Sequence, residues 1–133
     1  MIDHTGTYAL DFAKAKQFYD AALGALGYTV QREMVATWDP DFPTRHIVAY
    51  GDTRPIFWLI EVKDKRTPVH IAFVAKDEAA VHAFHQAGLA AGGSDNGKPG
   101  TRQQYHPGYY GSFLLDPEGN NVEAVIHHHR TVG

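Results

Sequence analysis

The fold is decided by a stretch of 24 residues that occurs twice in the chain. Residues 4–27 read HTGTYALDFAKAKQFYDAALGALG, and residues 70–93 read HIAFVAKDEAAVHAFHQAGLAAGG. Nine of the 24 aligned positions are identical at a spacing of 66 residues. Apart from alanines, the shared positions are His4/His70, Asp11/Asp77, Phe18/Phe84, Leu23/Leu89 and Gly27/Gly93. Such a repeat indicates that the same structural unit occurs twice.

Each copy has the pattern of a short strand followed by a helix, with strands predicted around residues 2–8 and 68–75. Asp11 and Asp77 suit helix N-caps, because a carboxylate there accepts free N–H groups of the first helical turn. Gly27 and Gly93 are predicted to end the helices, since glycine adopts the left-handed conformation at little cost. Apolar residues between them recur at helical spacing: Ala15, Phe18, Tyr19, Ala22 and Leu23 in the first copy, and Val81, Phe84, Gly88 and Leu89 in the second.

Three further strands are predicted after each helix, separated by turns rich in Pro, Gly and Asp. They span residues 28–35, 45–50 and 56–62 in the first half, and 103–105, 110–115 and 121–126 in the second. The polar, glycine-rich segment 92–111 is predicted to be a long loop, either functional or merely flexible. We therefore predict an α+β fold: a single domain, residues 1–133, of two βαβββ modules at about 1–64 and 67–127.

Composition narrows the class of protein. The 133 residues suit one domain, and their net charge of −3 without a basic cluster argues against nucleic-acid or membrane partners. The absence of cysteine excludes disulfides and thiolate metal sites. The amino terminus lacks the features of a secretion signal, and no stretch approaches the roughly 20 apolar residues that span a bilayer. A cytoplasmic location is the expectation.

Two histidines occupy equivalent places in the repeat. Around His70, the residues Val69, Ile71 and Phe73 alternate onto one strand face, which leaves His70 on the other. His4 takes the same place in the first copy. A single strand histidine is more often structural than a ligand. Two equivalent ones can face each other across a pseudo-twofold axis, and that favours a shared metal ion.

Glu123 is the predicted third ligand. It lies in a terminal, mostly apolar strand, where an unpaired carboxylate would be costly to bury. A rim position or an ordinary salt bridge is the alternative. Two imidazoles and one carboxylate leave about half of an octahedron open, which suits one divalent ion such as Fe, Mn, Ni or Zn.

The sequence resembles the vicinal oxygen chelate superfamily, which includes glyoxalase I, extradiol dioxygenases, fosfomycin-resistance enzymes and bleomycin-binding proteins. The resemblance covers about residues 1–127. It rests on Ile2-Asp3-His4, Phe18-Tyr19, Val69-His70-Ile71-Ala72-Phe73 and Asp116-Pro117-Glu118-Gly119-Asn120-Asn121-Val122-Glu123. It implies a glyoxalase-like fold, in which paired modules form a cupped mixed sheet around the metal, and it places His4, His70 and Glu123 at the ligand positions. Many members of the superfamily are homodimers, and some complete the cup across the dimer interface.

One position departs from the glyoxalase I pattern, in which a fourth ligand, usually Glu, comes from the last strand of the first module. The equivalent residue here is Trp58, whose indole cannot replace a carboxylate. Glu61 lies nearby, but a bulge would be needed to turn it inward. We therefore predict three protein ligands, with Trp58 forming a wall of the substrate cavity or simply packing.

The segment 102–110 concentrates polar and aromatic groups before a core strand. We predict that Arg102 pairs with an anionic substrate, that Tyr105 and Tyr109 contact the substrate, and that His106 or Tyr110 moves protons. Glu123 is the third predicted catalytic residue. The alternative, that the segment only packs a loop onto the sheet, accounts for these residues equally well.

The resemblance implies two functions of different classes. The first is a metal-dependent enzyme that chelates a small oxygen-bearing substrate, with lyase, isomerase, epoxide-opening or dioxygenase chemistry. The second is a non-catalytic protein of the bleomycin-resistance type that sequesters a small molecule. The partner in either case is a small molecule, and the protein is expected to be a homodimer.

Overall fold

A computed structural model describes residues 1–128 of the chain, so the last five residues of the predicted domain 1–133 lie outside it. The first half contains β1 (Thr5–Ala9), α1 (Phe12–Gly24), β2 (Thr29–Val35), β3 (His46–Gly51) and β4 (Phe57–Glu61). The second half contains β5 (His70–Val74), α2 (Glu78–Ala90), β6 (Ser94–Thr101), β7 (Tyr109–Leu115) and β8 (Asn121–His127). The order βαβββ thus occurs twice, as predicted.

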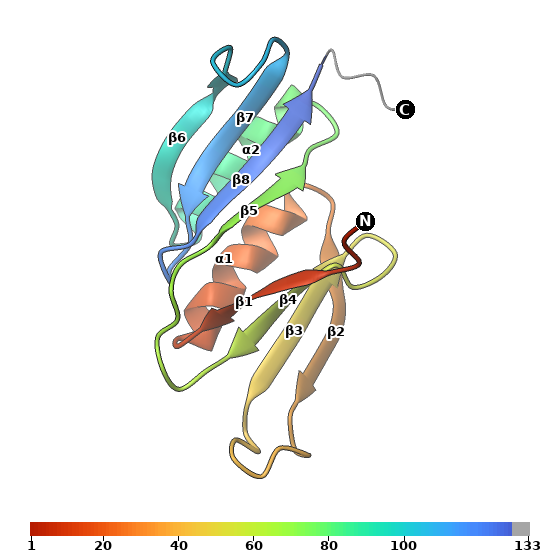
Figure 1. The fold of residues 1–133 in the computed structure, drawn as a ribbon, viewed down its shortest axis with the longest axis vertical. Helices are drawn as coiled ribbons and strands as arrows, with labels where there is room; N and C mark the ends of the chain where they lie inside the picture. Colours follow the sequence, from red (N-terminus) through yellow and green to blue (C-terminus); the bar gives the residue numbers. More distant parts are fainter. Residues whose placement is uncertain (129–133) are drawn as a thin grey trace.

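Each half forms its own four-stranded mixed sheet. The strand orders are β1-β4-β3-β2 and β5-β8-β7-β6. The pairs β1/β4 and β5/β8 are parallel, and the remaining neighbours are antiparallel. In Figure 1 the sheets lie one above the other along the long axis, with both helices behind them. This is the predicted α+β, glyoxalase-like arrangement of two modules.

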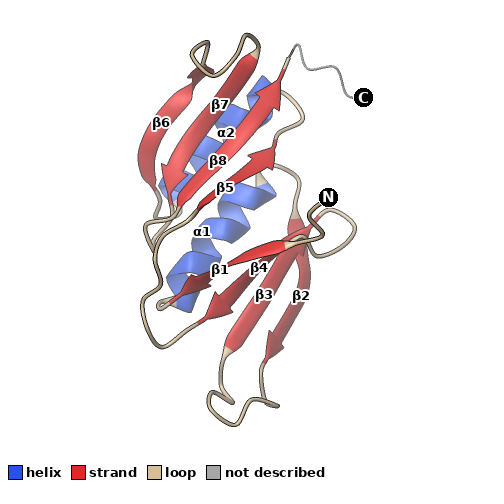
Figure 2. Ribbon diagram, viewed as in Figure 1, coloured by secondary structure: helices blue, strands red, loops and turns tan. Residues whose placement is uncertain are grey.

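The helices join the two halves through one hydrophobic core. α1 packs against β2, β3 and β4, α2 packs against β6, β7 and β8, and the helices pack on each other (Figure 2). The largest apolar side chains of this core are fully or almost fully buried: Phe18, Tyr19, Tyr50, Phe57 and Phe84. Neither helix within residues 1–128 has the length and apolar character needed to cross a membrane.

Both predicted N-caps are confirmed. The Asp11 carboxylate accepts the backbone N–H of Lys14, and the Asp77 carboxylate accepts that of Ala80. Gly27, which was predicted to follow the first helix in the left-handed conformation, has a φ of 91°. In the second half the left-handed residue is Gly92, with a φ of 101°, and not Gly93.

The predicted apolar stripe is confirmed along the whole of α1. In α2 it is confirmed except at its last predicted residue. Leu89 is exposed, and Ala80 and His85 are buried on α2 instead. Val69, which was expected to pack beneath α2, is 45% exposed and lies just before β5. Ile71 and Phe73 do turn toward the core, so His70 lies on the opposite face.

The predicted strand at residues 103–105 is wrong. The strand is β6, which lies inside the segment expected to be a loop, and it pairs with β7 through two register irregularities. Backbone hydrogen bonds to β7 stabilise an extended chain whatever its side chains are, and an edge strand tolerates Pro99 at an irregularity. The polar composition therefore reflects an edge strand rather than a loop.

Candidate metal centre

His70 and Glu123 come together on the second sheet, on the face opposite α2. β5 and β8 are paired so that Ala72 lies beside Glu123. Nε2 of His70 is 3.2 Å from Oε1 of Glu123. The Glu123 side chain is 2% exposed and that of His70 is 49% exposed. A buried carboxylate thus points at an imidazole that solvent can reach.

The geometry of this pair fits two ligands of one cation. Nδ1 of His70 lies 3.1 Å from the backbone oxygen of Asn121. Since a carbonyl only accepts hydrogen bonds, Nδ1 carries a proton and donates it. A neutral imidazole and an ionised carboxylate then present lone pairs to each other, so a proton or a cation is needed between them. Two ligand atoms that each lie roughly 2.1 Å from a metal ion are about 3 Å apart.

The second oxygen of Glu123 is held by Tyr109. The hydroxyl of Tyr109 donates to Oε2 of Glu123. Burial first, and then this hydrogen bond, raise the pKa of Tyr109. The rings of Tyr105, His106 and His127 surround that of Tyr109 edge-on, with centroids 4.9, 5.3 and 5.0 Å away. Tyr109, which was predicted to contact the substrate, therefore contacts a predicted metal ligand directly.

His4 lies just before β1, at the first sheet. Its Nδ1 is 2.7 Å from Oδ1 of Asp3, and Nη1 of Arg54 is 3.6 Å from the same oxygen. The hydrogen bond from His4, followed by the charge of Arg54, lowers the pKa of Asp3. With Nδ1 occupied by the carboxylate, Nε2 is the nitrogen that His4 can offer to a ligand. Such carboxylate–histidine pairs are common behind metal ligands.

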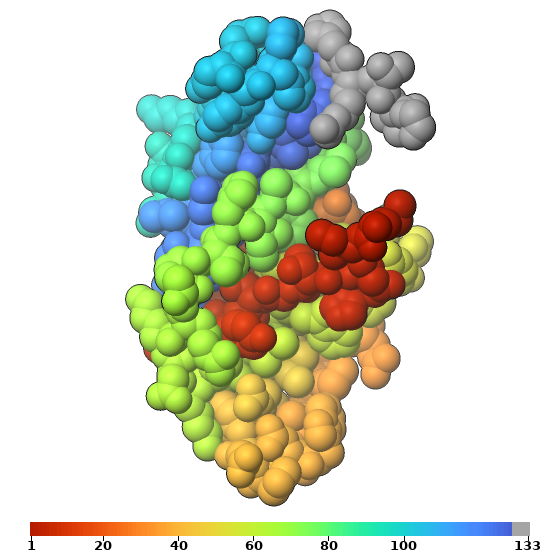
Figure 3. All heavy atoms as spheres, viewed as in Figure 1, coloured from red at the N-terminus to blue at the C-terminus, as the bar shows by residue number. Residues whose placement is uncertain are grey.

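The three predicted ligands do not meet within one chain. In residues 1–128, no three His, Cys, Asp or Glu side chains lie close enough together to hold a metal ion. The His4 side chain is 55% exposed, and the N-terminal segment lies open on the face shown in Figure 3. The structure thus joins His70 to Glu123 and leaves His4 apart from them.

Trp58 has the same register in the first sheet as Glu123 has in the second. Gly6 is opposite Trp58 in β1/β4, as Ala72 is opposite Glu123 in β5/β8. The equivalence inferred from the sequence is therefore confirmed. Trp58 lines an open cleft of about 410 Å³ that also includes His4, Tyr8 and Ile60.

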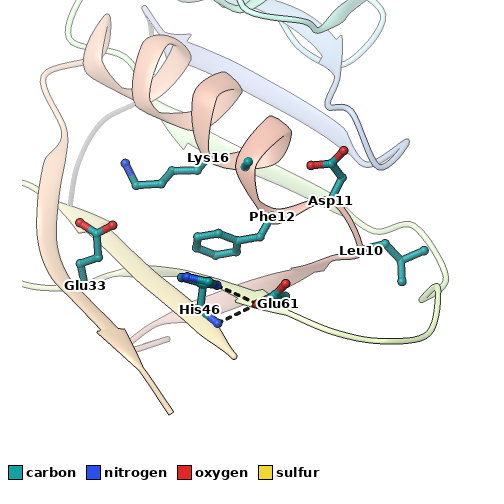
Figure 4. Close-up of a pocket in the computed structure, with 8 residues that line it drawn as sticks. Leu10, Asp11, Phe12, Lys16, Glu33, His46 and Glu61 are labelled. Atoms are coloured by element: carbon teal, nitrogen blue, oxygen red, sulfur yellow. Dashed lines mark hydrogen bonds and ion pairs between the residues drawn. The ribbon is translucent and has the colours of Figure 1, made fainter. Parts of the chain in front are cut away.

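Glu61 does not turn toward His4, because β4 pairs with both β1 and β3 without a bulge. Its carboxylate accepts the backbone N–H of His46 at 2.9 Å and lies 3.0 Å from the Nδ1 of His46. Both line a cleft of about 610 Å³, which lies beside α1 on the helix-bearing side of the first sheet (Figure 4). Phe12 stacks on His46 there. Glu61 thus lies in the cleft beside α1 and not in the cleft that includes His4.

The predicted residues of segment 102–110 separate into two groups. Arg102, Tyr105, His106 and Tyr109 lie on or beside the Glu123 face. The guanidinium of Arg102 is 5.4 Å from the centre of the Phe113 ring and donates to three backbone carbonyls. Tyr110 is buried on the opposite face, where its hydroxyl lies 2.6 Å from Nε2 of His82. The structure therefore does not bring Tyr110 to this site.

The contact between Tyr109 and Glu123 was missed in the sequence, although a signal for it exists. The Asp-Pro-Glu-Gly-Asn turn joins β7 and β8 so that Phe113 is opposite Glu123 and Tyr109 is opposite His127. Counting outward from that turn in steps of two places Tyr109, and not Tyr110, on the face of Glu123. The roles of Asp3 and of the Asn121 carbonyl have no such signal.

Comparisons with known proteins identify the family and agree with the fold. A family model described as the Glyoxalase/Bleomycin resistance protein/Dioxygenase superfamily matches residues 1–124. A glyoxalase/bleomycin resistance protein from Albidiferax ferrireducens is 27% identical, with a TM-score of 0.70 over 92% of this chain and 95% of that one. No curated protein matches the sequence.

Two more distant structures share the fold. A lactoylglutathione lyase from Agrobacterium tumefaciens is 21% identical, with a TM-score of 0.62 over 94% of this chain and 92% of that one. A glyoxalase I mutant from Zea mays is also 21% identical, with a TM-score of 0.66. The match covers 92% of this chain but 45% of the maize protein.

Proposed function

Because the chain belongs to the Glyoxalase/Bleomycin resistance protein/Dioxygenase superfamily, we propose that it is a divalent-metal-dependent enzyme acting on a small oxygen-bearing substrate. The class of reaction is that of the lyases, isomerases, epoxide-opening enzymes or dioxygenases of this superfamily. The observation that carries the proposal is the pair formed by His70 and Glu123, 3.2 Å apart with the carboxylate buried. We place the enzyme in the cytoplasm.

The metal ion, one of Fe, Mn, Ni or Zn, is held by His4, His70 and Glu123. Since His4 does not join the other two within one chain, two copies form a homodimer in which His4 of one copy completes the site of the other. Both imidazoles have Nδ1 bound to an oxygen and Nε2 available, which is the arrangement that metal-binding histidines use. Each copy of the domain, residues 1–133, thus contributes His70 and Glu123 to one site and His4 to the other.

A cation held by these residues would supply positive charge that stabilises negative charge developing on two oxygens of the substrate. The chain supplies the surroundings. Arg102 is fixed over Phe113 and attracts an anionic group of the substrate, while Trp58 and Tyr105 contact its apolar part. His106 exchanges protons through Nε2, which lies 2.9 Å from Nδ1 of His127, while the carbonyl of Pro107 accepts from its Nδ1.

Metal analysis of protein purified without chelator tests the proposal. We expect about one divalent ion per chain in the wild type, and at least roughly 100-fold weaker binding in His70→Ala, because a ligand is lost. His70 is half exposed, so its replacement should leave the fold intact. Wild-type protein that binds no divalent ion would refute the proposal that the protein is a metal-dependent enzyme.

A mixing experiment tests the shared site. His4→Ala and His70→Ala are each expected to lose the metal when purified alone. If the ligands come from two copies, a mixed dimer has one intact site and one site that lacks both histidines. Refolding the two variants together at equal amounts should therefore restore metal to about a quarter of the sites. No restoration would mean that each site is built within one chain.

A second candidate function, sequestration without chemistry, is favoured by the cleft beside Trp58 and Tyr8. Tyr8, Trp58 and Ile60 line it together with His4, Thr5 and Gly6, and its aromatic and aliphatic side chains suit a flat apolar ligand. Wild-type protein that lacks metal but binds flat aromatic molecules, with quenching of Trp58 fluorescence, would favour this function over the enzyme.

A further inference from the structure

We propose that Tyr109 is a positioning residue for Glu123: its hydroxyl holds one carboxylate oxygen, so that the other oxygen alone faces the cation. This role rests on the proposed metal-binding function. It concerns two residues of the same chain, so it does not depend on whether the site is completed within the chain or by a second copy.

The two oxygens of Glu123 have different partners. Oε2 accepts from the hydroxyl of Tyr109, and Oε1 lies 3.2 Å from Nε2 of His70. The carboxylate is almost completely buried, so neither oxygen turns freely toward solvent. A ligand held in this way offers a metal ion one oxygen in a fixed direction.

Gly111 gives Tyr109 the room to reach the carboxylate. It lies between Tyr109 and Phe113 along β7, on the same face. A Cβ at this position would be 3.4 Å from both Oε2 of Glu123 and Cε1 of Tyr109, and 3.1 Å from the backbone oxygen of Ala124. The tyrosine ring therefore occupies the space that a side chain at residue 111 would fill.

The surrounding rings keep the phenol in place. Tyr105, His106 and His127 all contact the Tyr109 ring edge-on, and the two imidazoles are hydrogen-bonded to each other at 2.9 Å. Edge-to-face contacts of this kind add stability beyond simple burial. The hydroxyl of Tyr109 is thus fixed by its own ring as well as by its acceptor.

The consequence concerns the number of open coordination positions. Trp58 stands where a second carboxylate would be, and Tyr109 limits Glu123 to one oxygen. With His4 and His70, the protein then supplies three ligand atoms, and about three of the six positions of an octahedral ion stay open. A substrate that binds through two oxygens fits there without displacing a protein ligand.

The test compares two neighbouring tyrosines in metal-binding titrations of the full chain against a chromophoric chelator. Tyr109→Phe removes the hydroxyl that touches Glu123 but keeps the ring. Tyr110→Phe removes a hydroxyl bonded to His82 on the opposite face. We expect Tyr109→Phe to weaken Co(II) or Zn(II) binding by about 10- to 100-fold, the usual effect of losing such a partner. Tyr110→Phe should bind within about twofold of the wild type.

The visible spectrum of the Co(II) form provides a second readout, because its bands respond to the ligand set and not to overall stability. We expect the bands to shift in Tyr109→Phe and to stay unchanged in Tyr110→Phe. Gly111→Ala keeps the hydroxyl but crowds the ring, so it should also weaken metal binding. Since Gly111 does not have a positive φ, alanine can adopt its backbone conformation.

The outcomes separate this role from the metal site itself. If the wild type binds metal and Tyr109→Phe binds it equally well with an unchanged Co(II) spectrum, the role of Tyr109 is refuted and the site stands. If both tyrosine variants lose affinity equally, the effect is structural and the role is again refuted. A wild type that binds no metal would overturn the proposed function together with this role.

Discussion

The two halves of the molecule share their backbone plan but differ at one equivalent position, residue 123 in the second half and residue 58 in the first. In the second half, Glu123 lies beside Ala72 and carries a buried carboxylate. In the first half, Trp58 lies beside Gly6 and carries an indole. A duplicated sheet therefore fixes where a side chain points and leaves open what it offers. One half here places a buried carboxylate at this position, and the other places an indole there.

The helices of the two halves are anchored differently as well. Tyr19 on α1 and His85 on α2 are equivalent in the repeat, and both are buried. The hydroxyl of Tyr19 donates over 2.5 Å to Asp116, in the β7–β8 turn of the other half. His85 lies 2.9 Å from Asp95, in its own half. This hydrogen bond of the first helix thus crosses to the second module, whereas that of the second helix stays within its own module.

The largest effect expected from this comparison is on stability. Asp116 is 5% exposed and accepts hydrogen bonds from Tyr19, the amide of Asn120 and two backbone N–H groups. In Asp116→Asn, the NH2 group of the new side chain would face groups that now donate hydrogen bonds to the carboxylate. We therefore expect this substitution to lower the free energy of unfolding by about 3 kcal/mol. Asp95→Asn should cost clearly less, because its side chain is 43% exposed. Urea unfolding of both variants measures the difference, and equal losses would contradict the asymmetry.

The next effect concerns the different neighbours of Trp58 and Glu123. A Cβ at Gly6 would lie 2.8 Å from the backbone oxygen of Trp58, so β1 and β4 would have to separate. We expect Gly6→Ala to lower the free energy of unfolding by about 2 kcal/mol through overpacking. Gly24→Ala is the matched control, since nothing lies within 4 Å of the added methyl group. A stable Gly6→Ala variant would show that the first sheet adjusts as easily as the second.

The smallest effect is a shift in titration. A hydrogen bond from the backbone N–H of Gly97, followed by one from His85, lowers the pKa of Asp95 from its ordinary value of 3.8. A lowered carboxyl pKa stabilises the fold above the ordinary value, and this contribution is lost as the pH falls through the lowered pKa. NMR titration of the Asp95 carboxyl should give a midpoint below 3.8 in the wild type. In His85→Phe the midpoint should rise but stay below 3.8, because the larger cause is retained. A midpoint at 3.8 in the wild type would contradict this account.

Sequence reasoning succeeded where one local pattern decides the structure. The repeat, the helical stripe of α1 and the capping aspartates depend on residues close together in the chain, and all were predicted. It failed at β6, because an edge strand is stabilised by backbone bonds to β7 that no local pattern records. It also placed Tyr110 as well as Tyr109 at the site, although adjacent residues of a strand point to opposite faces and only Tyr109 lies on the face of Glu123.

By itself, the sequence determined that two similar modules exist, that His4 and His70 are equivalent, and that Trp58 occupies the position equivalent to Glu123. These follow from periodicity and spacing, which the chain carries without folding. Only the tertiary structure decided that His70 meets Glu123, that Tyr109 holds the second oxygen, and that His4 stays apart. Those facts depend on how separate strands pair and how two modules pack, and such long-range contacts are set by the burial of the whole core.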